Sequence, residues 1–130
     1  MKIAFHKIDA ERHALVIERG GRTERVECET RSYLVHDLLH YAVESEAGLD
    51  GGFWGHLARG KTLADMNDRT GKALAGQAPE LPMIEQMVGA LSGAVKGRSA
   101  HELVTGLRRH AEAQSITIPA YLTEPFIVAT

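Results

Sequence analysis

The chain has 130 residues, 44% of them hydrophobic and 25% charged, with a formal net charge of −2. These values are typical of a globular protein and exclude an intrinsically disordered one, and the length fits a single domain over residues 1–130. Positions 1–65 hold 9 basic and 11 acidic residues, and positions 66–130 hold 6 of each. Neither half therefore has the basic surface of a nucleic-acid-binding protein.

Nothing in the sequence predicts secretion or membrane insertion. Cys28 is the only cysteine, so an internal disulfide is excluded. The N-terminal segment MKIAFHKIDAERHA is too charged for a signal peptide, and no apolar run approaches the roughly 20 residues of a membrane span. We therefore expect a cytoplasmic protein without a membrane partner.

The first 28 residues predict about three β-strands. KIAFH places Ile3 and Phe5 on one side, which is the period of a half-buried strand. HALVIERGGRTERVEC predicts a hairpin, because Gly20 and Gly21 can adopt the positive φ angles of a two-residue turn. Centring the turn on these glycines predicts the cross-strand pairs Ile17 with Glu24, Leu15 with Val26 and His13 with Cys28. The buried face would then contain Leu15, Ile17, Val26, His13 and Cys28.

The period changes to helical from Tyr33 to about Ala47. Ser32 is a suitable N-cap for this helix, and Gly48 is a suitable terminator. A glycine-rich turn, GLDGGFWG, comes next and is followed by a weaker helical stretch, HLARGKTLADMN. The two aromatic residues of the turn, Phe53 and Trp54, are expected to plug the end of the first helix, with a role as pocket walls as the alternative.

Two further helices are predicted after a long loop over residues 68–82. One apolar stripe follows Pro82 and consists of Ile84, Met87, Val88, Leu91 and Val95. Ser99 and Glu102 have the spacing of a capping box for the next helix, whose expected inner face is Leu103, Val104, Leu107 and Ala111. Glycines at 89, 93 and 106 would permit close contact between these helices. The tail ITIPAYLTEPFIVAT, interrupted by two prolines, is expected to be extended.

The residues that carry chemistry lie in HDLLHYAVE, residues 36–44. At about 100° per residue, His36, Asp37, His40 and Glu44 fall within one arc of about 100° on a helical wheel. Apolar residues fill most of the remaining circumference, namely Leu34, Val35, Leu38, Leu39, Tyr41, Ala42 and Val43. The helix is therefore expected to be buried except along this polar strip.

Two histidines four residues apart project from one helix face and can share a cation. HDLLH resembles the HExxH signature of zinc metalloproteases, in which two histidines bind zinc and the glutamate activates water. The resemblance implies that His36 and His40 bind zinc and that Asp37 is a base for water activation. Asp37 stands where that family has glutamate, and its carboxylate would lie about one methylene farther from the metal. Metal binding is therefore expected to tolerate the change better than proteolysis.

Glu44 lies eight residues beyond His36, about 12 Å along the helix axis, which is too far for the two to share an ion. We expect Glu44 to accept a hydrogen bond from His40 and to orient that ring. The candidates for further ligands are His6, His13, His56, Cys28, Asp50 and Asp65, although His13 beside Cys28 is interpreted as part of the core. A different interpretation stays open, in which the polar strip is only the solvated side of an amphipathic helix.

The stretch from HDLLHYAVE through GFWGHLARG also resembles segments of small bacterial proteins of uncharacterised function. The likeness covers roughly a quarter of the chain. It implies a bacterial single-domain family and brings no activity, cofactor or catalytic residue.

The sequence thus predicts an α+β fold, with a small N-terminal antiparallel sheet of about three strands covered by three or four helices. The predicted function is zinc binding at His36 and His40, with metal-assisted hydrolysis in which Asp37 and Glu44 take part. The alternative is a non-catalytic scaffold that forms a homodimer through its glycine-containing C-terminal helices. That alternative rests on the apolar stripe of Ile84, Met87, Leu91 and Val95, whose burial would need a partner chain.

Overall fold

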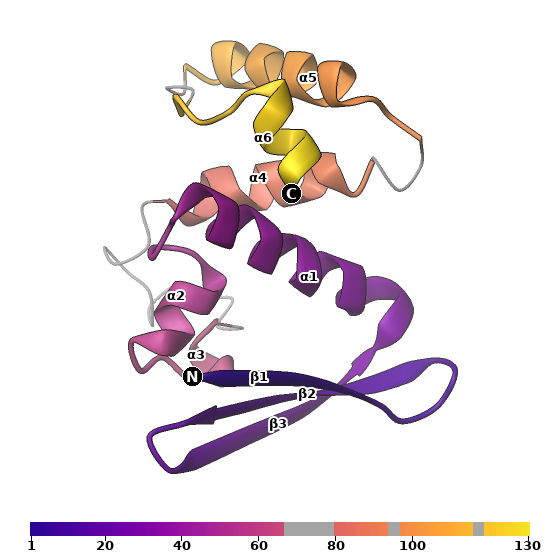
Figure 1. Cartoon of the computed structure of the whole chain (residues 1–130), viewed down its shortest axis with the longest axis vertical. Coiled ribbons are helices and arrows are strands. Elements are labelled where there is room, and N and C mark those ends of the chain that lie inside the picture. The colour runs from indigo at the N-terminus through magenta and orange to yellow at the C-terminus, as the bar shows by residue number, and fades with distance from the viewer. Residues whose placement is uncertain (67–79, 94–96, 116–118) are drawn as a thin grey trace.

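The computed structural model describes residues 1–66, 80–93, 97–115 and 119–130. In these ranges a three-stranded antiparallel sheet is followed by six helices (Figure 1), which confirms the predicted α+β class. The strands are β1 (Lys2–Lys7), β2 (Arg12–Arg19) and β3 (Arg22–Glu29). The helices are α1 (Thr30–Ala47), α2 (Phe53–Ala58), α3 (Leu63–Met66), α4 (Leu81–Leu91), α5 (Ala100–Ala113) and α6 (Glu124–Ala129).

The hairpin of β2 and β3 has the predicted register. Ile17 pairs with Glu24, Leu15 with Val26 and His13 with Cys28. Gly20 and Gly21 make the turn at φ values of 55° and 75°, which residues other than glycine rarely adopt. His13, Leu15 and Ile17 are buried, and Val26 and Cys28 on the same face are half-buried.

Helix α1 begins three residues earlier than an N-cap at Ser32 would allow, at Thr30 instead of Tyr33. The prediction of Ser32 as the N-cap is wrong, because the helix starts at Thr30 directly after β3. The Thr30 N–H donates to the Glu11 carbonyl oxygen at 2.8 Å, and no side chain caps the start of the helix. The predicted end is confirmed, since Gly48 has a φ of 64° and donates to the last carbonyls of the helix.

The buried hydrophobic residues form two separate clusters. In the first, Leu15 and Ile17 of the sheet pack with Trp54, Leu57 and Leu63 of α2 and α3. The second joins Val43 of α1 to the inner faces of α4, α5 and α6. Figure 1 shows α1 running between the sheet, with α2 and α3, and the three C-terminal helices. Helix α1 is thus the element that connects the two clusters.

The C-terminal helices bury their predicted faces within the chain. Ser99 caps α5 by accepting the Glu102 N–H, and Leu103, Val104, Leu107 and Ala111 are buried. Ile84, Met87 and Leu91 of α4 are also buried, so their burial needs no partner chain, contrary to the reasoning behind the homodimer alternative. Val95 and most of the predicted loop over 68–82 lie outside the described residues, and α4 begins at Leu81 within that predicted range.

Two predictions for this half of the chain are wrong. The tail is not wholly extended, because Thr123 caps a short helix and Pro125 lies in its first turn, where no backbone N–H is required. Gly89 and Gly106 are not points of close contact, since a Cβ added at either would meet nothing within 4 Å. Among the three glycines, only the one at 93 lies tightly against neighbouring atoms.

The buried side of α1 differs from the predicted one. Asp37, His40 and Glu44 of the polar strip are buried together with Val43, whereas the apolar residues Val35, Leu38 and Tyr41 are exposed. The polar strip can be buried because α2 and α4 supply partners for its charged and polar groups. The described parts of the chain leave Val35, Leu38 and Tyr41 uncovered over about half of their surface. None of the described helices is both long and apolar enough to cross a bilayer.

Candidate metal centre

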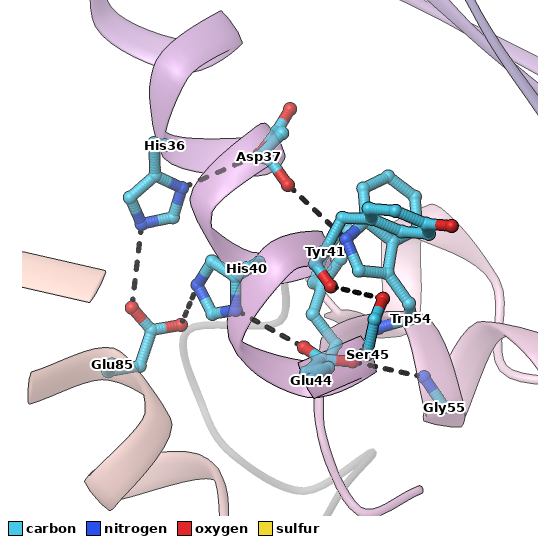
Figure 2. Close-up of polar contacts among 10 residues, drawn as sticks. His36, Asp37, His40, Tyr41, Glu44, Ser45, Trp54, Gly55 and Glu85 are labelled. Carbon is cyan, nitrogen blue, oxygen red and sulfur yellow. Dashed lines mark hydrogen bonds and ion pairs between the residues drawn. The ribbon is translucent and has the colours of Figure 1, made fainter. Parts of the chain in front are cut away.

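Helices α1 and α4 bring together two histidines and one glutamate (Figure 2). The ring centroids of His36 and His40 are 4.7 Å apart. The carboxylate of Glu85, from α4, lies between the rings, with Oε1 at 3.1 Å from Nε2 of His40 and Oε2 at 3.5 Å from Nε2 of His36. One ligand atom from each of the three residues lies within 4.8 Å of the other two.

The donor atoms lie close enough to reach one small cation after small movements. Zinc binds imidazole nitrogen and carboxylate oxygen at about 2.0–2.2 Å, which places tetrahedral ligand atoms about 3.3–3.6 Å from one another. The two nitrogen–oxygen distances, 3.1 and 3.5 Å, are close to that separation and involve the two different oxygens of Glu85. A donor set of two imidazoles and one carboxylate suits zinc or iron better than magnesium or calcium, which prefer oxygen ligands alone.

The buried nitrogen of His40 is the most informative atom of the centre. The His40 side chain is 1% exposed, and its Nε2 has no hydrogen-bond partner among the described residues. Oε1 of Glu85 lies 3.1 Å from this nitrogen and forms an ion pair with it when His40 is protonated. Buried polar atoms are rarely left without a partner, because the loss of hydration costs about 1–3 kcal/mol. A proton shared with Glu85, or a metal ion bound beside Glu85, would satisfy Nε2.

The opposite nitrogen of each ring is held by a carboxylate of α1. Nδ1 of His40 lies 3.3 Å from Oε1 of Glu44, as predicted, and Nδ1 of His36 lies 3.4 Å from Oδ1 of Asp37. A hydrogen bond from Nδ1 to a carboxylate places the ring proton on Nδ1 and leaves Nε2 free to bind a metal. Both rings can therefore present Nε2 toward Glu85 in the same tautomer.

Glu44 is itself fixed by the start of α2. Its Oε1 accepts the Phe53 N–H at 2.7 Å, and its Oε2 accepts the Trp54 N–H at 2.9 Å. These are backbone donors in the first turn of a helix, where a negative charge is favourable. Figure 2 shows the resulting chain of contacts from α2 through Glu44 to His40 and Glu85.

Trp54 is a core residue and not a pocket wall. Its indole ring is buried with Leu15 and Ile17, and its Nε1 donates to the Asp37 carbonyl oxygen at 3.3 Å. Trp54 thereby joins α2 to α1 and to the sheet. Phe53, which is half-buried, lies beside His40 with 5.8 Å between the ring centroids.

The pKa values of His36, His40 and Glu85 depend on the contacts among these three side chains and their neighbours. Contacts with Asp37 and then with Glu85 raise the pKa of His36 to about 9. Burial disfavours the charged form of His40, but Glu44 and Glu85 outweigh it, so the pKa of His40 is also raised. Contacts with His36 and then His40 lower the pKa of Glu85 to about 2. The carboxylates thus favour protonated rings in the metal-free protein, and a bound metal ion would displace these protons.

The structure brings together the predicted ligands His36 and His40 and adds Glu85, which the sequence did not single out. None of the other ligand candidates, His6, His13, His56, Cys28, Asp50 and Asp65, belongs to the described three-residue group. Asp37 contacts the ring nitrogen of His36 that points away from Glu85, which supports an orienting role. A role for Asp37 as the base stays a prediction.

Comparison with known proteins adds no relative, since a scan against family models, a search of curated proteins and a search of solved structures each found no match. The inference of function therefore rests on the geometry of the centre.

Proposed function

We propose that this protein binds one divalent metal ion, with zinc as the leading candidate, through Nε2 of His36, Nε2 of His40 and the Glu85 carboxylate. The observation that carries the proposal is the grouping, in the described part of the chain, of the buried Nε2 of His40 with the Glu85 carboxylate and a second imidazole. Three protein ligands with further positions open are typical of catalytic zinc sites, whereas structural sites are closed by four.

The open side of the centre faces solvent. The side chains of His36 and Glu85 are 45% and 48% exposed, so water and small substrates can reach the space between them. A zinc ion there would supply Lewis acidity and lower the pKa of a water molecule to about 7, which is the basis of metal-assisted hydrolysis. The chain would contribute ligand orientation through Asp37 and Glu44.

Elemental analysis of untagged protein tests the binding proposal. We expect close to one equivalent of zinc per chain, and a loss of at least tenfold in occupancy in His40→Ala and in Glu85→Gln. His101→Ala is the matched control, because His101 pairs with Glu124 on α5 and α6 and has no contact with the centre. The same donor set occurs in non-haem iron enzymes, so iron is measured in parallel. Protein that contains no metal and takes up none from solution would refute the proposal.

Hydrolysis is tested separately with an activated ester, 4-nitrophenyl acetate. Zinc-loaded protein should hydrolyse the ester faster than Glu85→Gln at the same zinc concentration, and His101→Ala should equal the parent. Equal rates for the parent and for Glu85→Gln would remove the hydrolytic part of the proposal and leave metal binding in place.

A further inference from the structure

Helix α1 exposes an apolar face on the side away from the candidate metal centre. With His40 at 0° on a wheel of about 100° per residue, Leu38, Ala42 and Val35 lie at about 160°, 200° and 220°. Val35 and Leu38 are 43% and 45% exposed. Tyr41, at about 100°, is 55% exposed at the edge of this face. We call the residues Arg31, Val35, Leu38, Tyr41, Ala42, Ser45 and Glu46 the outer face of α1.

The outer face has the spacing of a helix-pairing seam. Arg31, Val35, Leu38, Ala42 and Ser45 follow one another at intervals of four, three, four and three residues. This is the a/d pattern by which two helices pack side by side with interlocking side chains. Packing within the described parts of the chain leaves the centre of this seam open, since Val35 and Leu38 keep 43% and 45% of their surface exposed.

The charged residues at the two ends of the outer face indicate which kind of partner binds there. Arg31 at one end and Glu46 at the other are both exposed, and neither forms an ion pair in the described parts of the chain. When two copies of α1 lie antiparallel around a two-fold axis beside Leu38, Arg31 of each copy lies opposite Glu46 of the other. Val35 then lies opposite Ala42. A face that is complementary to itself under a two-fold rotation is what a symmetric dimer requires.

We propose that a second copy of this chain docks on the outer face, with the two α1 helices antiparallel. A membrane surface fits this face less well, because interfacial helices flank their apolar side with several cations, whereas the outer face has one cation, Arg31, and one anion, Glu46. The seam is only about 22 Å long, which places the interface at the small end of specific contacts. The dimer is therefore reversible, with a dissociation constant on the order of micromolar.

Sedimentation equilibrium over a range of concentrations tests the proposal. The parent should approach twice the chain mass of 14.2 kDa, and Leu38→Glu should stay at the mass of one chain. The matched control is Val128→Glu on α6, because Val128 is 77% exposed and lies outside the outer face. Circular dichroism of each variant verifies folding.

Charge reversal tests the antiparallel arrangement and works even if Leu38→Glu fails to fold. Arg31→Glu and Glu46→Arg, made singly, should each raise the dissociation constant about tenfold, since two pairs per dimer become repulsive. The double variant should restore the parent value within about threefold, because the pairs are attractive again with their signs exchanged.

A parent that remains monomeric at all concentrations would overturn the proposal, whether or not the face binds vesicles or another protein. A dimer that persists in Leu38→Glu, or a double variant as weak as the single ones, would overturn it as well. Metal content does not enter this experiment, so the dimer and the metal centre can fail independently.

Discussion

At the scale of single residues, the centre depends on how each nitrogen of His40 is used. Nδ1 faces the buried carboxylate of Glu44, and Nε2 lies 3.1 Å from Oε1 of Glu85. His36 repeats the arrangement with Asp37 and the other oxygen of Glu85. Glu85 is thus shared by two imidazoles, and its removal would disturb both rings at once.

The shared carboxylate gives the metal-free protein a defined pH dependence. Because the pKa of Glu85 falls from 4.5 to about 2, its contribution to stability is present above pH 4.5 and is lost as the pH falls toward 2. Because the pKa of His36 rises from 6.5 to about 9, its contribution is present below pH 6.5 and is lost as the pH rises through 9. Chelator-treated protein should therefore be most stable between pH 4.5 and 6.5.

Urea unfolding at a series of pH values measures this profile. Both side chains are about half exposed, so the pH-dependent change in unfolding free energy should be modest. Glu85→Gln should flatten the profile, whereas Glu124→Gln, which breaks the exposed pair with His101, should leave it unchanged. A profile that is the same in the parent and in Glu85→Gln would contradict the pairing described for the metal-free state.

At the scale of elements, the close approach of α2 to α1 depends on a glycine. A Cβ on Gly52 would overlap the carboxylate of Glu44, which accepts the first backbone donors of α2. Glycine is therefore required at position 52 of the sequence GLDGGFWG, because a larger residue would occupy the space of the Glu44 carboxylate. The orientation of His40 depends on the same contact.

Gly52→Ala should destabilise the protein by about 2 kcal/mol, because the added methyl group forces Glu44 away from α2. The matched control is Gly89→Ala in α4, where a Cβ meets nothing, and it should stabilise by about 0.5–1 kcal/mol through helix propensity. Chemical denaturation of both variants provides the comparison. Equal effects from the two substitutions would show that Glu44 does not need the space.

The elements also show which parts of the structure the sequence could predict. The register of β2 with β3 follows from two local features, the two-residue period and the glycine pair at the turn. The end of α1 at Gly48 and the cap of α5 likewise follow from neighbouring residues. The start of α1 does not, since the helix follows β3 directly and the Thr30 N–H is bonded to Glu11, which is distant in the sequence.

The candidate site was only half predictable, because its third donor depends on tertiary packing. His36 and His40 are marked by their spacing, and the contact of Glu44 with His40 follows from the same helix. Glu85 is on the opposite helix, and its position depends on how α4 packs on α1. The apolar majority on α1 predicted the wrong buried face, because Phe53 and Trp54 supply the backbone donors that make burial of Glu44 favourable.

At the scale of the whole molecule, the centre lies between the two hydrophobic clusters. His36 and His40 belong to α1, which contacts the sheet, and Glu85 belongs to α4, which packs with α5 and α6. An ion bound by all three residues would cross-link the two halves of the structure. Metal binding and overall stability are therefore expected to be coupled.

Zinc should raise the thermal midpoint of chelator-treated protein. At a free concentration 100 times the dissociation constant, a ligand that binds only the folded state stabilises it by about 2.7 kcal/mol, or roughly 10 °C for a chain of this size. Scanning calorimetry should detect this shift in the parent and in His101→Ala, and no shift in Glu85→Gln. A shift of the same size in Glu85→Gln would place the zinc elsewhere.

Anomalous X-ray scattering from zinc-loaded crystals would locate an ion held by His36, His40 and Glu85. We expect a single strong peak at the zinc absorption edge, about 2.0–2.2 Å from Nε2 of both histidines and from a Glu85 oxygen. A zinc-loaded crystal with no peak between α1 and α4, or with its peak at other residues, would show that these three residues do not form the site.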